Sequence, residues 1–368
     1  MTTASTIWPI LTAWGSGEIP TIAQRDQVMN WMVDPERAAA WQVDRSSISA
    51  ALDSRIRLLQ SIIRQLNSGV ELPLPGDWTE WIEPMWTLWL PLALRIDRTQ
   101  RHKASHAQHC LVQGILGGQG TGKTTLSRIL QLLLNMLGQE AAVMSIDDLY
   151  LTYAERCKLK RQDPRFVWRG PPGTHDVDLG IRTFKQIGHA TPGQQVELPR
   201  FDKSLYGGQG DRTQPTLTTA PTVILFEGWC VGAQPLDADA FADLSALPKP
   251  IDTEADRLFA RECNARLMAY LPLWEYLDSL IVLQPEDYRF SRQWRQQAER
   301  QMIARGKSGL LDSEVAAFVT YFWQALHPQL FITPLTRSDC TDLVITLNQD
   351  HRVSKLALPS SGGTLKPM

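Results

Sequence analysis

The chain of 368 residues is poor in cysteine, nearly neutral, and without a long apolar run. Its five cysteines are odd in number and widely spaced, which excludes a disulfide framework and a zinc-binding pattern. They are expected to be reduced thiols in a cytoplasmic protein, with a redox-regulatory pair as the alternative. The net charge of −2 points to neither nucleic acid nor an anionic membrane as a partner. The most apolar stretch, residues 85–94, is too short to cross a bilayer and is interrupted by Pro91.

Other signals are missing as well. The first residues lack the basic segment of a secretory signal, and the chain has no internal repeat and no low-complexity segment. No feature indicates an obligate protein partner. Hydrophobic residues make up 43% of the chain and charged residues 21%, which is typical of a globular protein with one large domain or two smaller ones.

The chain does contain one strong phosphate-binding motif. Residues 117–124 read Gly-Gly-Gln-Gly-Thr-Gly-Lys-Thr and match G-x-x-x-x-G-K-[ST]. An apolar run at 110–116 precedes the motif and a helical apolar pattern follows it, which is the strand, loop and helix order of a P-loop. In such a loop the backbone N–H groups surround an anion at a helix N-terminus, the lysine reaches the β- and γ-phosphates, and the threonine binds Mg²⁺. The predicted nucleotide-binding residues are Gly117, Gly118, Gln119, Gly120, Thr121, Gly122, Lys123, Thr124 and Thr125.

Carboxylates follow two further predicted strands. Asp147 and Asp148 come after the apolar residues 141–146, and Glu227 comes after 221–226. Ligands of open α/β sheets bind at the C-terminal ends of the strands. Asp147 is therefore a candidate base for a hydroxyl that attacks the γ-phosphate, and Glu227 a candidate for positioning Mg²⁺ together with Thr124. Asp148 either contacts the substrate or only caps the following helix.

These elements predict an α/β protein with the three-layer P-loop NTPase fold and a mainly parallel sheet. Residues 106–355 form this domain, residues 1–105 a helical N-terminal extension that ends in a linker at 95–108, and residues 356–368 a disordered tail. Eight of the thirteen tryptophans lie in the extension. Their aromatic surface is expected to pack against the P-loop domain, with an aromatic ligand pocket as the alternative.

Two basic segments are predicted to be loops, at 156–176 and 198–212. Their cations could hold an anionic substrate, or they could belong to solvated, flexible loops. Arg289, Arg292 and Arg295 recur every three residues and are expected to share a helix face. That face could close over ATP and stabilise transition-state charge, with Arg292 and Arg295 as catalytic residues, or it could be an ordinary exposed helix.

Several motifs together resemble the glycerate kinase family of plants and cyanobacteria. The resemblance rests on the order of five segments: 117–125, Ser145-Ile-Asp-Asp-Leu-Tyr150, Gly173-Thr-His-Asp176, Pro199-Arg-Phe-Asp-Lys-Ser204 and Phe226-Glu-Gly-Trp229. It covers roughly residues 110–350. This family is part of the larger group of P-loop kinases with phosphoribulokinase, uridine kinase and pantothenate kinase.

The resemblance implies transfer of a phosphoryl group from ATP to D-glycerate, giving 3-phosphoglycerate, the closing step of the photorespiratory glycolate route. It implies ATP and Mg²⁺ as cofactors, Asp147 as the base, Lys123 at the phosphates and Glu227 beside the metal. Asp148 and Asp176 are the acidic candidates for substrate contact. The substrate carboxylate is expected at one of four cations, and the resemblance does not decide among His175, Arg200, Lys203 and Arg212.

Two alternatives stay open. Another kinase of the same group could act on pantothenate or a nucleoside, although the acceptor loops carry more cations than aromatic rings. A non-enzymatic GTP switch or P-loop regulator is a second alternative. Against it, the chain lacks the Asn-Lys-x-Asp motif of guanine-specific switches, and a regulator does not need Asp147 and Glu227 together at strand ends.

Overall fold

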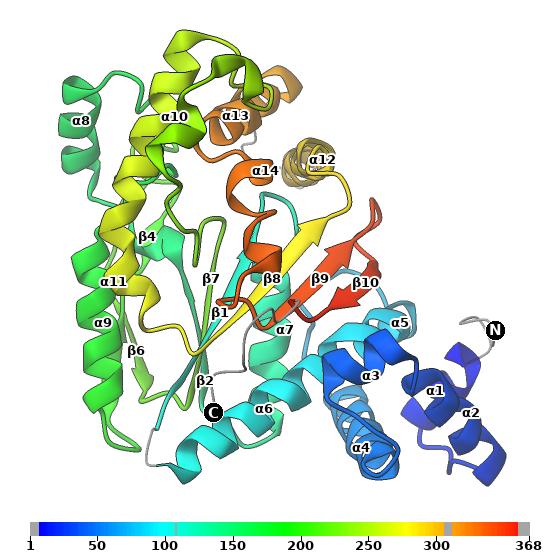
Figure 1. The fold of residues 1–368 in the computed structure, drawn as a ribbon. Coiled ribbons are helices and arrows are strands. Elements are labelled where there is room, and N and C mark those ends of the chain that lie inside the picture. The colour runs from blue at the N-terminus through cyan, green and yellow to red at the C-terminus, as the bar shows by residue number, and fades with distance from the viewer. Residues whose placement is uncertain (1–6, 107–108, 305–310, 360–368) are drawn as a thin grey trace.

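The computed structural model describes residues 7–106, 109–304 and 311–359. A central six-stranded sheet has the spatial order β10-β9-β8-β1-β7-β2 (Figure 1). All neighbouring strands are parallel except β9 and β10, which are antiparallel. The predicted mainly parallel sheet is confirmed. The strands are β1 Leu111–Gly117, β2 Ala141–Ser145, β7 Val223–Gly228, β8 Ser279–Pro285, β9 Leu343–Leu347 and β10 Val353–Ala357.

Both faces of the sheet are buried, which explains why its strands read as continuous apolar runs. In β1, Ile115 packs into the core on one face and Leu116 into the core on the other. The first core also receives α7 (Lys123–Met136) and the N-terminal helices. The second core is covered by α9 Val177–His189, α10 Glu254–Leu267, α11 Leu271–Trp274, α13 Asp312–Ala325 and α14 Pro328–Phe331 (Figure 1).

The N-terminal extension is helical, as predicted. Its helices are α1 Trp8–Gly15, α2 Ile22–Met32, α3 Pro35–Trp41, α4 Ile48–Asn67, α5 Ile82–Pro84 and α6 Leu90–Ser105, with a π-helical turn at Met85–Trp89. All eight of its tryptophans are buried in, or packed against, the same core as β1 and α7, and Trp14 and Trp86 have no exposed surface. The tryptophans therefore join the extension to the P-loop domain.

Two segments predicted as irregular are helical. The predicted linker at 95–108 is the second half of α6 as far as Ser105, while residues 107 and 108 lie outside the described residues. The polar residue Asp97 is buried there because Arg101 and Gln139 donate hydrogen bonds to its carboxylate. The first part of the predicted loop 156–176 belongs to α8 (Tyr153–Gln162), whose buried residues are Leu159 and Arg156.

Two small ladders and several short turns complete the described structure. β3 (Gln195–Leu198) pairs with β6 (Thr216–Thr219), and β4 (Phe201–Asp202) pairs with β5 (Asp211–Arg212). β10 continues two residues past the predicted end of the domain at 355, and residues 360–368 of the predicted tail lie outside the described residues. None of the described helices is long and apolar enough to cross a membrane. Short 3₁₀ helices occur at Trp78–Trp81, Ile146–Leu149, Ala238–Phe241, Leu244–Ala246, Met268–Tyr270 and Leu335–Arg337.

Candidate active site

A cavity of about 340 Å³ lies beside the glycine loop, where β1, β7 and β2 end. Because parallel strands end at one edge of a sheet, this edge brings together residues that are far apart in the sequence. We call this space the active-site cavity. The residues that line it and bear on its chemistry are Gln119, Gly120, Gly122, Lys123, Thr124, Thr125, Asp147, Tyr150, Arg169, Lys203, Glu227, Trp229 and Arg295.

The glycine loop forms the floor of the cavity, in the place that the motif predicts. Gly122 has a φ of +82°, a backbone conformation that favours glycine, and α7 begins at the next residue. Thr121 Oγ1 and Lys123 Nζ donate hydrogen bonds to the carbonyl oxygen of Gly118 at 2.9 and 3.1 Å. Burial lowers the pKa of Lys123, and the charges of nearby carboxylates act against that shift. Gly117 ends β1 beneath this loop.

Thr124 and Glu227 place two side-chain oxygen atoms, possible metal ligands, next to Lys123. Thr124 Oγ1 donates to Glu227 Oε1 at 2.8 Å, and the Glu227 side chain is buried at the end of β7. Such a pair fits Mg²⁺, which takes one or two protein oxygens and completes its shell with phosphate oxygens and water. Within the described residues, no cluster of three or more His, Cys, Asp or Glu side chains is arranged to hold a metal ion.

Asp147 faces the cavity from the end of β2 and accepts two hydrogen bonds. The Tyr150 hydroxyl donates to Oδ1 at 2.7 Å and Lys203 Nζ to Oδ2 at 2.5 Å. Burial of the carboxyl group raises its pKa, but the charge of Lys203 and the two hydrogen bonds outweigh burial and hold the pKa well below its ordinary value. An ionised carboxylate is therefore fixed in the cavity, where it can orient a hydroxyl group.

Of the six residues predicted to contact the substrate, only Lys203 lines the cavity. Arg200 Nη1 pairs with Asp148 Oδ2 at 3.2 Å, and Asp148 also accepts the backbone N–H of Ser145, so this aspartate caps the 3₁₀ helix after β2. Arg212 Nη2 pairs with Asp176 at 2.9 Å. These four side chains form two ion pairs, and β4 contacts the 3₁₀ helix Ile146–Leu149 that follows β2. None of the four lines the cavity, and a substrate contact by any of them stays a prediction.

The three arginines at α12 (Phe290–Ala304) do not share one environment. Arg295 lines the active-site cavity and pairs with Glu299. Arg292 instead lies over the Trp323 ring, with its guanidinium carbon 5.3 Å from the ring centroid, and does not line the cavity. Arg289 precedes the helix and pairs with Asp287. The catalytic role of both arginines stays a prediction, and of the two only Arg295 lines this cavity.

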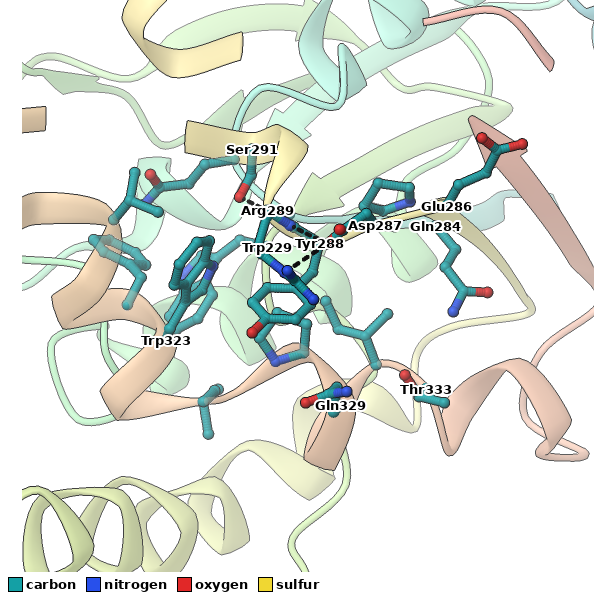
Figure 2. Close-up of a pocket in the computed structure, with 18 residues that line it drawn as sticks. Trp229, Gln284, Glu286, Asp287, Tyr288, Arg289, Ser291, Trp323, Gln329 and Thr333 are labelled. Atoms are coloured by element: carbon teal, nitrogen blue, oxygen red, sulfur yellow. Dashed lines mark hydrogen bonds and ion pairs between the residues drawn. The ribbon is translucent and has the colours of Figure 1, made fainter. Parts of the chain in front are cut away.

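Arg289 belongs to a second cavity of about 310 Å³, shown in Figure 2. This cavity lies between the end of β8 and the helices α13 and α14, and it touches the glycine loop at Gly118 and Gln119. Figure 2 shows Trp323 on one side of it and Gln284 and Thr333 on another. It adjoins the active-site cavity, because Gln119 and Trp229 line both.

Of the cavity residues listed above, Tyr150, Arg169 and Trp229 were not predicted from the sequence. Tyr150 and Trp229 stand inside the segments 145–150 and 226–229, so these motifs already carry a signal for them. Arg169 lies in the basic segment 156–176, where it is one cation among many. Only the fold separates it from its neighbours.

His175 is buried behind Tyr150 and does not line the cavity. Its ring stacks on Tyr150 with centroids 4.6 Å apart, and Nδ1 lies 2.7 Å from the Tyr270 hydroxyl. Its side chain is 6% exposed, and burial lowers its pKa to about 4, although the charge of Asp147 acts in the opposite direction. The predicted substrate contact of His175 stays a prediction, and in the structure its imidazole supports the Tyr150 ring, whose hydroxyl donates to Asp147.

The low pKa of His175 predicts a specific loss of stability in acid. As pH falls below about 6.5 the unfolded chain binds a proton at this residue, whereas the folded chain does so only near pH 4. The wild type should therefore lose roughly 2–3 kcal/mol that His175→Gln does not lose. Urea unfolding of both proteins at pH 7 and pH 4.5 measures this difference. An unchanged gap between them would mean that the folded chain does not hold His175 neutral.

Comparison with known proteins identifies relatives of the chain. No family model matches it. It is 34% identical over 253 residues to the chloroplastic D-glycerate 3-kinase of Arabidopsis thaliana, a match that covers 66% of this chain and 53% of the plant protein, so the chain spans about half the length of that relative. It is 32% identical over 222 residues to an uncharacterized kinase of Schizosaccharomyces pombe, covering 57% of this chain and 78% of the relative. It is 30% identical over 246 residues to a probable ATP-dependent kinase of Saccharomyces cerevisiae, covering 63% and 81%.

Solved structures show the same fold. A D-glycerate 3-kinase of Cryptococcus neoformans var. grubii superposes with a TM-score of 0.64 and 26% identity, over 73% of this chain and 99% of that chain. The YGR205w protein superposes with a TM-score of 0.61 over 73% of this chain and 96% of its own, and at 24% identity it supports the fold alone. The geometry of the glycine loop and the kinase relatives agree. The chain therefore belongs to the family of P-loop kinases that contains these D-glycerate 3-kinases.

Proposed function

We propose that this protein transfers the γ-phosphoryl group of ATP to a hydroxyl group of D-glycerate, giving 3-phosphoglycerate and ADP. The observation that carries the proposal is the joint position of Asp147, Lys123 and the Thr124–Glu227 pair around one cavity. The relatives named as D-glycerate 3-kinases support the choice of acceptor. The photorespiratory role and the cytoplasmic setting expected from the sequence belong to the same proposal.

Each residue of the cavity has its own role in the reaction. The loop N–H groups and Lys123 bind the phosphates, and Arg295 adds positive charge from α12, where negative charge moves onto the β–γ bridging oxygen as that bond breaks. Asp147 orients the acceptor hydroxyl in line with the phosphorus and takes its proton as the new P–O bond forms. Because its pKa is low, Asp147 contributes mainly by positioning, which suits a loose transition state.

Thr124 and Glu227 are the residues that would hold Mg²⁺. When bound, the ion neutralises charge on the β- and γ-phosphates. Glu227 is well suited to this task, since its carboxylate is buried and touches no cation within hydrogen-bond distance among the described residues.

The proposal is tested by ADP release from the purified protein with Mg²⁺-ATP and a panel of acceptors. D-glycerate, L-glycerate, pantothenate, uridine and ribulose 5-phosphate are compared, with a chelator as the metal control. We expect stimulation by D-glycerate, with 3-phosphoglycerate as the product, and loss of activity on chelation. Stimulation by pantothenate or uridine alone would replace the acceptor and keep the kinase. If no acceptor stimulates ADP release, the enzyme reading itself is wrong.

A further inference from the structure

Arg169 is a cation in the active-site cavity, and among the described residues no carboxylate forms an ion pair with it. Its Nη1 donates to the carbonyl oxygens of Gly208 and Gln209 at 2.7 and 3.0 Å. Across the described residues no Asp or Glu forms an ion pair with it, whereas Lys203 is paired with Asp147 and Arg295 with Glu299. Two neutral carbonyls fix the guanidinium without cancelling its charge. Its Nε and Nη2 make no hydrogen bond to the rest of the described chain.

The backbone that follows Arg169 is constrained. Gly170 has a φ of +129°, and a Cβ there would lie 2.2 Å from the Phe322 ring, so the turn after Arg169 admits only glycine. The Trp229 indole N–H donates to the Gly170 carbonyl at 3.1 Å. The side chain of Arg169 thus has two carbonyl acceptors at its tip and a constrained backbone at its base. Such a side chain loses little conformational entropy when it binds an anion.

The position of Arg169 relative to Asp147 indicates which kind of anion it binds. The guanidinium carbon of Arg169 lies 5.9 Å from the Tyr150 ring centroid, and the Tyr150 hydroxyl donates a hydrogen bond to Asp147. All three residues line the same cavity. An acceptor that carries a carboxylate a few bonds from its hydroxyl can therefore reach the arginine and the aspartate at once.

We propose that Arg169 is the residue that binds the carboxylate of the acceptor, through a two-pronged contact from Nε and Nη2. The inference rests on the proposed function and deepens it. It explains why Arg200 and Arg212 are unsuited to this role, because each is already paired with an aspartate. It also makes the enzyme selective for hydroxy acids over neutral alcohols, since a neutral acceptor leaves the Arg169 charge uncompensated.

The test compares Arg169→Gln with the wild type on D-glycerate and on glycerol, which has the same carbon chain without the carboxylate. The ratio of kcat/KM for D-glycerate to that for glycerol should fall by about 10- to 100-fold, the effect of one hydrogen-bonded charge, and mainly through KM for D-glycerate. Arg169→Lys should restore only part of the ratio, because an ammonium group cannot make the two-pronged contact. Arg165→Gln is the matched control: this arginine lies on the same segment, pairs with Asp163 and does not line the cavity, so the ratio should not change.

Three outcomes would overturn the inference. An unchanged ratio in Arg169→Gln, with thermal unfolding like that of the wild type, removes the carboxylate role. Equal losses on both acceptors together with a higher KM for ATP would assign Arg169 to the phosphates. A wild type that phosphorylates only a neutral acceptor would also refute it. If instead the wild type prefers another acid, such as pantothenate, the proposed acceptor fails while Arg169 is tested with that acid and its neutral alcohol, pantothenol.

Discussion

Asp147→Asn is expected to lower kcat by about 10²- to 10⁴-fold, while the affinity for ATP stays close to that of the wild type. The amide keeps the size of the carboxylate but cannot accept the proton of the acceptor hydroxyl. It also loses the ion pair that holds Lys203 at 2.5 Å. Asp147 lies after the end of β2, and the phosphate-binding groups lie on the loop after β1, so we expect the nucleotide affinity to depend little on this residue.

Steady-state kinetics and a direct measurement of ATP binding by calorimetry separate these effects. Asp148→Asn is the matched control, because the neighbouring carboxylate caps a 3₁₀ helix and pairs with Arg200 outside the cavity. Its kcat should remain near that of the wild type, apart from any loss of stability. Near-normal turnover of Asp147→Asn would remove the base assignment, and a loss in Asp148→Asn as large as that in Asp147→Asn would show that the structure separates the two residues wrongly.

Lys123→Ala is expected to impair both nucleotide binding and phosphoryl transfer, with a weaker affinity for ATP and a fall of roughly 10²- to 10³-fold in kcat. The Lys123 ammonium donates to the Gly118 carbonyl and lies in a buried position beside the loop, so it is preorganised to meet phosphate oxygens. An interaction that is made in the ground state and becomes stronger in the transition state changes KM and kcat together when it is removed. That pattern distinguishes Lys123 from Asp147.

The same kinetic and binding measurements test the prediction for Lys123→Ala. Lys185→Ala is the control, because this lysine is exposed on α9, far along the chain from the loop. A Lys123→Ala protein with normal ATP affinity but low kcat would limit the lysine to the transition state. Normal values of both constants would mean that the phosphates bind elsewhere, and the assignment of the glycine loop would be wrong.

Local patterns sufficed for the main parts of the fold. Continuous apolar runs predicted the buried parallel strands, and the helical spacing after Gly122 predicted α7. The failures were segments whose burial depends on distant partners. The second half of α6 looked like a linker because Asp97 and Arg101 are polar, yet their pairing with each other and with Gln139 makes burial possible. The helix α8 was missed because its buried side carries one apolar residue, Leu159, and the charged Arg156, which donates to the carbonyls of Gln209 and Gly210.

The sequence by itself determined the phosphate loop, the acidic residues at the strand ends and the three-layer fold, because each depends on residues that are neighbours in the chain. The tertiary structure alone decided which cations are available to a substrate. Arg200 and Arg212 read like Arg169 in the sequence, but the fold brings an aspartate to each of the first two and two neutral carbonyls to the third. Charge compensation acts through space between distant segments, and only the arrangement of the whole chain can show which charge remains unpaired.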